Sequence, residues 1–92
     1  MKAKCDFPHI DYTSIPNHCR EGMLLYIENG IIPGDFLRAV LENNFVEVIG
    51  RADLINRREL ENYAGFLYWE MPSGSWGSRE KVLEWSERRR NA

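Results

Sequence analysis

The fold is decided by residues 33–72, which read PGDFLRAVLENNFVEVIGRADLINRRELENYAGFLYWEMP. Apolar residues recur there at three- and four-residue intervals, the spacing that places side chains on one face of an α-helix. The first expected helix has Pro33 at its first position and Asp35 in its first turn, where a negative charge meets the positive end of the helix dipole. Its apolar side is formed by Phe36, Leu37, Val40 and Leu41.

A second, short helix is predicted over residues 45–50. Asn44 and Glu47 have the spacing of a capping box in which Asn replaces Ser or Thr. Gly50 weakens the helix at its end. The side chains expected to point inward are Phe45, Val48 and Ile49.

A third and longer helix is predicted from Leu54 to about Glu70, with Asp53 as its cap and Pro72 as its stop. Its apolar side chains recur at helical spacing. They are Ile55, Leu60, Tyr63, Ala64, Phe66, Leu67 and Met71.

The flanking sequence adds one helix on each side. Before the central stretch, a helix enters at Ser14 and Pro16, buries Cys19, Met23, Leu24 and Ile27, and stops at Asn29-Gly30. After it, Ser78 caps a last helix from Arg79 to about Arg89 with Val82, Leu83 and Trp85 inward. We therefore predict an all-α, single-domain bundle of about five helices over residues 15–92, preceded by a short extended arm over residues 1–14.

Length and composition describe an ordinary small globular protein. The 92 residues are 43% apolar and 28% charged, and the formal net charge is −2. This charge gives no electrostatic reason to expect DNA or an anionic membrane as partner. No apolar run approaches the roughly twenty residues that a membrane span needs, and no secretion signal is visible. A cytoplasmic protein without membrane contact, with Cys5 and Cys19 as reduced thiols, is expected.

No constellation of side chains predicts catalysis or a cofactor. Cys5, His9, His18 and Cys19 are possible zinc ligands, but their spacing lacks the usual two-residue knuckle, so we expect no metal and regard Cys19 as a core residue. His18, Asp53, Glu59 and Glu61 could serve acid–base chemistry only if they converged in a cleft, and the sequence gives no sign of that. We expect no enzyme and no cofactor.

Arg51, Arg57 and Arg58 form the central basic cluster. A short helix, a turn and a longer helix surround them, an order similar to a helix-turn-helix that binds DNA. Acidic residues on the longer helix offset this charge, which favours a solvated face with local ion pairs. Nucleic-acid binding through helices within residues 45–70 stays an alternative.

Aromatic residues gather in the last third of the chain. Residues 63–69 are so rich in aromatics that one buried stripe cannot cover them all. Either the last helix folds over them, or some form an exposed patch of the kind that is enriched in protein interfaces. The interface residues that we predict are Tyr68, Trp69, Trp76 and Trp85.

Short motifs are spread over residues 15–85. They are Ile15-Pro16 with His18 and Arg20; Tyr26-Ile27-Glu28 with Gly30; Pro33-Gly34 with Phe36-Leu37 and Ala39-Val40-Leu41; Ala52-Asp53; Asn56-Arg57; Phe66-Leu67-Tyr68; and Pro72 with Gly74, Trp76-Gly77-Ser78 and Glu80-Lys81-Val82. In this pattern the chain resembles a group of small helical proteins encoded by bacteriophages and prophages. The resemblance implies a phage origin and a role inside the infected bacterium, without implying a particular activity.

The resulting hypothesis is a protein that works by binding. We expect a viral protein that interacts with a host protein or complex, for example as an inhibitor of a bacterial defence or regulatory complex. Self-association as a homodimer would also cover the aromatic patch. A small-molecule enzyme would require a polar pocket, which the sequence does not indicate.

Overall fold

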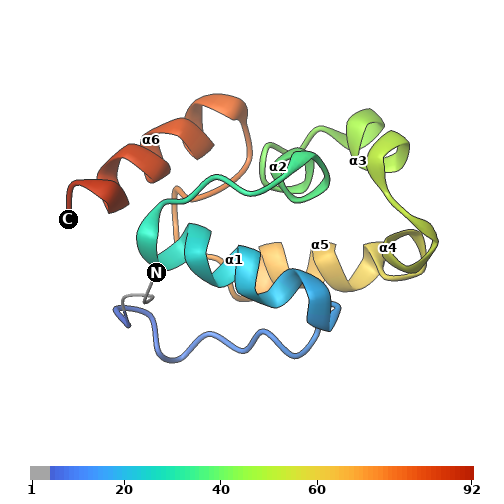
Figure 1. Cartoon of the computed structure of the whole chain (residues 1–92), viewed down its shortest axis with the longest axis horizontal. Helices are drawn as coiled ribbons and strands as arrows, with labels where there is room; N and C mark the ends of the chain where they lie inside the picture. The colour runs from blue at the N-terminus through green and yellow to red at the C-terminus, as the bar shows by residue number, and fades with distance from the viewer. Residues whose placement is uncertain (1–4) are drawn as a thin grey trace.

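The computed structural model describes residues 5–92. This part of the chain forms α-helices joined by loops and contains no β-strand (Figure 1). The prediction of a small all-α domain is therefore confirmed. The first four residues of the predicted arm lie outside the described range. The helices are α1 (Asn17–Asn29), α2 (Asp35–Leu41), α3 (Phe45–Arg51), α4 (Leu54–Arg58), α5 (Leu60–Trp69) and α6 (Arg79–Arg90).

Helix α1 lies at the centre of the core. Met23, Tyr26 and Ile27 on this helix are completely buried, and Cys19 is buried as predicted. The Tyr26 hydroxyl donates a hydrogen bond of 2.6 Å to the carbonyl oxygen of Ser75, which lies in the loop between α5 and α6. This loop therefore closes one side of the core. The other buried apolar residues come from α2, α5 and α6, from Ile10 in the arm, and from Ile15 and Ala52 in the connections before α1 and after α3.

Helix α6 packs on the end of α1 at Gly30. The sequence predicts a stop there, and Gly30 does end α1 in the left-handed conformation, with φ 76°. The Ser86 hydroxyl donates to the Gly30 carbonyl oxygen, and the Trp85 indole N–H donates to the Ile27 carbonyl oxygen at 3.2 Å. Two polar contacts thus fix α6 to α1.

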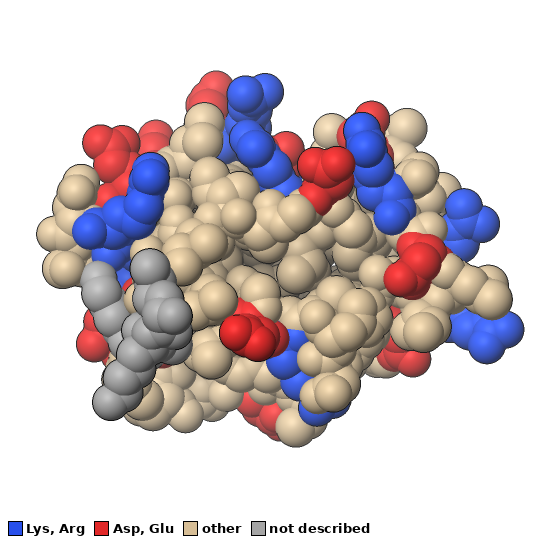
Figure 2. All heavy atoms as spheres, viewed as in Figure 1, with Lys and Arg blue, Asp and Glu red and all other residues tan. Residues whose placement is uncertain are grey.

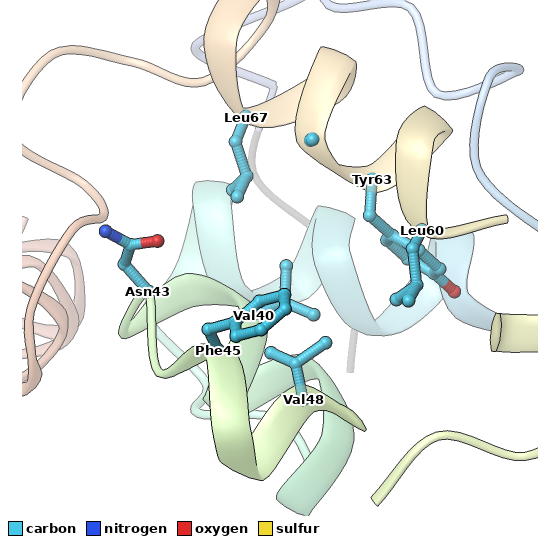
Figure 3. Close-up of a pocket in the computed structure, with 8 residues that line it drawn as sticks. Val40, Asn43, Phe45, Val48, Leu60, Tyr63 and Leu67 are labelled. Atoms are coloured by element: carbon cyan, nitrogen blue, oxygen red, sulfur yellow. The ribbon is translucent and has the colours of Figure 1, made fainter. Parts of the chain in front are cut away.

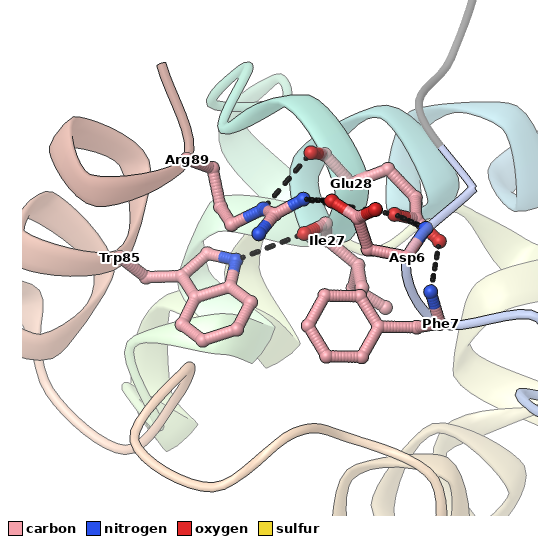
Figure 4. Close-up of polar contacts among 6 residues, drawn as sticks. All are labelled: Asp6, Phe7, Ile27, Glu28, Trp85 and Arg89. Atoms are coloured by element: carbon pink, nitrogen blue, oxygen red, sulfur yellow. Dashed lines mark hydrogen bonds and ion pairs between the residues drawn. The ribbon is translucent and has the colours of Figure 1, made fainter. Parts of the chain in front are cut away.

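The described part of the arm is held against the helices by a buried carboxylate (Figure 4). Glu28, only 2% exposed, accepts the backbone N–H groups of Asp6 and Phe7 at 2.8 and 2.9 Å. The Arg89 guanidinium donates to the Glu28 carbonyl oxygen at 3.0 Å and pairs with Asp6. Phe7 lies against Trp85, with 5.8 Å between the ring centroids. The arm is therefore packed from residue 6 onward.

The predicted long helix over residues 54–70 is wrong in one respect, because the chain breaks at Glu59 between α4 and α5. Glu59 has φ −103° and ψ 10°, outside the helical region. Asn56, at the inner side of α4, is buried and accepts a hydrogen bond of 2.8 Å from the Tyr63 hydroxyl. The break turns α4 so that its apolar Leu54 and Ile55 face solvent.

The predicted caps agree with the structure better than the predicted helix starts do. Side chains of Asn44, Asp53 and Ser78 accept backbone N–H groups of α3, α4 and α6, as predicted. Ser14 does not cap α1, which begins at Asn17 after Pro16. Pro33 precedes α2 by two residues instead of occupying its first position.

Five apolar residues that were predicted to point inward are exposed. They are Phe45, Ile49, Ile55, Ala64 and Leu83. Helix α3 packs beside α2 and buries none of its residues, because the rest of the described chain leaves its outer side uncovered. Helical spacing predicts that side chains share a face, but a neighbouring element must cover that face to bury it.

Candidate interaction surface

The structure separates the four predicted interface residues. Tyr68 and Trp69 at the end of α5 are 73% and 77% exposed, and their rings meet edge to face with centroids 4.7 Å apart. Trp76 is half-buried against the core. Trp85 is 5% exposed and belongs to the core, so the prediction that it contributes to an exposed patch is wrong.

Exposed apolar side chains are concentrated on α3, α4 and α5. Seven of the eight large ones that the described residues expose lie on these three helices, and Leu83 on α6 is the eighth. Single exposed apolar residues are normal on a monomer, so it is their concentration on three consecutive helices that makes these helices the candidate interaction surface. We call it the α3–α5 surface; it consists of Phe45, Val46, Ile49, Leu54, Ile55, Tyr68 and Trp69.

A hollow of about 520 Å³ lies between α3 and α5, beside this surface (Figure 3). Side chains from α2, α3 and α5 point into it from opposite sides, and nearly all of them are apolar. Phe45, 74% exposed, forms one edge. The lining is Val40, Asn43, Phe45, Val48, Leu60, Tyr63, Ala64 and Leu67. Such a lining suits an apolar side chain better than a polar substrate.

A second depression, the arm–α5 groove, lies on the other side of α5. It consists of two hollows of about 850 and 750 Å³ that share Ser14 and Asn62. One wall is residues 11–16, the end of the arm and its connection to α1, and the other is formed by residues of α4 and α5. Trp69 lines the first hollow and Ile55 the second, so both hollows meet the α3–α5 surface.

The predicted nucleic-acid residues do not form a free basic patch. Arg51 pairs with Asp35 and Glu47, each at 3.2 Å. Arg57 and Arg58 are exposed on α4. Figure 2 shows positive and negative side chains interspersed over the face that it presents, without an extended field of one sign. These observations do not favour phosphate binding, which needs concentrated positive charge.

The possible zinc ligands and catalytic residues do not converge. Cys5, His9 and His18 are exposed, whereas Cys19 is buried. Within residues 5–92, no three side chains of the ligand types lie close enough together to hold a metal ion. Asp53 caps α4 by accepting the Asn56 N–H at 2.7 Å.

Buried tyrosines account for the large pKa shifts, and each has a structural explanation. Burial, with a hydrogen bond to Cys19, raises the pKa of the Tyr63 hydroxyl far above its ordinary value. Burial and the charge of Glu42 likewise raise the pKa of Tyr26. These hydroxyls stay protonated and bonded inside the core, so neither serves as an acid or base at a surface site.

Sequence reasoning missed the α3 and α4 part of the surface. Phe45, Val46, Leu54 and Ile55 were not among the predicted interface residues. A signal for α3 was present: four of the five residues over 45–49 are apolar, which is too many for one buried stripe of a short helix. The same crowding had pointed to Tyr68 and Trp69, and both are exposed; their role in an interface stays a prediction.

Comparison of the chain with protein-family models, curated proteins and solved structures finds no match. The resemblance to small phage and prophage proteins thus stays a prediction. No helix in the described part of the chain has the length and apolar character that crossing a membrane requires.

Proposed function

We propose that this chain is a non-enzymatic phage protein that binds a bacterial host protein or complex through the α3–α5 surface and modulates it, for instance as an inhibitor of host defence. The resemblance over residues 15–85 suggests the phage and host setting. The surface itself supports binding as the mode of action. The proposal places the partner inside the host cell, where the infecting phage would express the protein.

The observation that carries this proposal is the clustering of seven large exposed apolar residues on three consecutive helices. Fully burying one such side chain contributes about 1.5–3 kcal/mol. Covering even half of the cluster would therefore offset a substantial part of the entropy lost on association. Trp69 is the strongest candidate anchor, because tryptophan is enriched among residues that dominate binding energies.

The test is a pull-down from bacterial lysate with the tagged protein and three variants. Trp69→Ala and Phe45→Ala remove exposed side chains of the surface, so both should fold normally. Leu83→Ala is the matched control, since Leu83 is also exposed but lies on α6. We expect a stoichiometric protein that the wild type and the control retain and that both surface variants lose.

Two outcomes would contradict the proposal. One is a partner that all four proteins retain equally, which would place the contact elsewhere. The other is an eluate that contains nucleic acid without a protein partner. That result would favour the predicted alternative of a small nucleic-acid-binding protein using Arg51, Arg57 and Arg58.

A further inference from the structure

The arm–α5 groove has an acidic rim. Asp11 and Glu70 line its first hollow together with Glu61, and Glu59 lines its second. Arg20 is the one basic residue in either lining, so four carboxylates face one guanidinium. Hydrogen bonds from the Thr13 hydroxyl and backbone N–H hold the pKa of Asp11 below its ordinary value, which keeps this carboxylate charged.

Some of the charged groups of the rim already form hydrogen bonds within the chain. Arg20 donates to the carbonyl oxygens of Ile15 and Thr13, both at 3.0 Å, and so fixes the arm. Glu70 accepts the Asp11 N–H at 3.0 Å, and Glu59 accepts from Asn62. Each of these carboxylates retains acceptor capacity, because an ionised carboxylate can accept several hydrogen bonds.

The floor of the groove contains a glycine that the fold does not require. Gly65 lies inside α5, where glycine destabilises a helix relative to other residues. A Cβ atom at this position would meet nothing within 4 Å. Its φ is not in the left-handed range, so no backbone conformation demands glycine. The missing side chain instead leaves room for another backbone to approach α5 closely.

Aromatic and aliphatic side chains stand at the ends of this floor. Trp69 is 77% exposed and its ring meets that of Tyr68 edge to face, so the indole is accessible to a ligand. A cation above such a face is attracted by the ring electrons, most strongly for tryptophan. Ile55, exposed at the other end, supplies an apolar contact.

We propose that the arm–α5 groove binds a basic amphipathic helix of the partner, which crosses α5 over Gly65 and sets a lysine or arginine side chain on Trp69. The acidic rim complements the basic residues of this helix, and Ile55 contacts its apolar side. An amphipathic helix laid in a groove is a recurring mode of recognition. The inference rests on the proposed function, since it names the kind of segment that the protein partner would offer.

The test measures binding of two synthetic peptides of about 18 residues, long enough to form a helix. One is a labelled lysine/leucine amphipathic peptide, and the other is its glutamate/leucine counterpart. Fluorescence anisotropy should show saturable one-to-one binding of the basic peptide only. This binding should weaken as salt rises from about 0.05 to about 0.5 M, because exposed charge pairs are screened.

Two glycines make a matched pair of variants for locating the peptide. Gly65→Gln fills the floor of the groove, while Gly50→Gln makes the same change in α3, where a Cβ also meets nothing within 4 Å. Both changes should raise the thermal midpoint, because glutamine favours a helix more than glycine does. Of the two glycine variants, only Gly65→Gln should weaken peptide binding, by about ten-fold or more. Trp69→Ala should weaken it to a similar extent.

Several results would overturn this inference. Equal binding of both peptides would show that charge complementarity does not select the peptide. Unchanged affinity in Gly65→Gln would show that the peptide does not bind in the groove. Loss of binding in Gly50→Gln alone would place the peptide on α3. Sedimentation showing a dimer that forms through the groove would mean that a second copy of the chain, and not a partner helix, occupies it. If the pull-down yields a Trp69-dependent partner but the basic peptide does not bind, this inference fails while the proposed function stands.

Discussion

Replacement of Gly30 by alanine should strongly destabilise the fold, because it adds a methyl group where α6 packs closely on the end of α1. Gly30 has φ 76°, and a Cβ atom there would lie 2.3 Å from the Ser86 carbonyl oxygen and 3.0 Å from the Arg89 Cβ. The first contact is with backbone, so it cannot be relieved by a side-chain rotation. Helix α6 must move away from α1 to admit the methyl group.

The expected loss can be worked out from these contacts. Holding a non-glycine residue in the left-handed conformation costs about 1–2 kcal/mol. Displacing α6 also weakens the hydrogen bonds from Ser86 to Gly30 and from Trp85 to Ile27, worth about 1 kcal/mol each. The sum is about 3–4 kcal/mol, which for a domain of this size lowers the thermal midpoint by on the order of 10–30 °C.

The assay is urea unfolding followed by circular dichroism, with Gly50→Ala as the control. The same substitution in α3 meets no atom within 4 Å and should stabilise the protein by about 0.5–1 kcal/mol. The two variants should therefore change the free energy of unfolding in opposite directions. A loss below about 1 kcal/mol in Gly30→Ala would refute the account of a close, fixed crossing.

Three other changes test separate parts of the structure. In Glu28, one carboxylate oxygen accepts the Asp6 N–H and the other the Phe7 N–H, so Glu28→Gln places an NH₂ donor opposite one of these N–H groups. This change should cost about 1–3 kcal/mol and speed amide exchange at residues 6 and 7, and unchanged exchange would contradict the buried carboxylate's role. Tyr12 has a buried hydroxyl with no hydrogen-bond partner within residues 5–92, and burial, aided by the charge of Glu28, raises its pKa to about 12. The unfolded chain loses this proton first, near pH 10, so the contribution of Tyr12 to the free energy of unfolding is constant below that pH and decreases as the pH rises to about 12. Tyr12→Phe should make this decrease smaller and leave the free energy of unfolding at neutral pH equal or higher. Urea titrations at a series of pH values measure both effects. Asp53→Ala removes the cap of α4 and should cost about 0.5–2 kcal/mol, seen as faster exchange in α4, whereas unchanged protection there would exclude a capping role.

Local signals in the sequence were sufficient for three helix caps and for the end of α1. A cap needs only one acceptor side chain and the N–H groups that follow it, so Asn44, Asp53 and Ser78 could be recognised directly. The end of α1 at Gly30 is equally local. The break at Glu59 has no such mark, because a run of charged residues with good helix propensity precedes it.

Which face of a helix is covered depends on elements far away in the sequence. Trp85 is buried because Phe7 and the end of α1 surround it, and neither contact can be read from α6 alone. Phe45 is exposed for the converse reason, since no described segment returns over α3. The exposed residues of the candidate site were thus half predictable: crowding indicated that some side chains near Tyr68 and on α3 must be exposed, while which of those on α3 are exposed required the arrangement of the helices.

The lack of buried residues on α3 has a consequence for how a partner would be bound. This helix buries no residue. Its half-buried Val48 packs against the core, and the exposed pair of Arg51 and Asp35 joins it to α2, an interaction worth about 0–1 kcal/mol. Segments with so few buried contacts open locally at a small fraction of the free energy of global unfolding. In the proposed complex, part of the binding free energy would be spent on closing the α3 segment, and the bound partner would slow its opening. Ordering of this helix would then link affinity to the internal motion of the free protein.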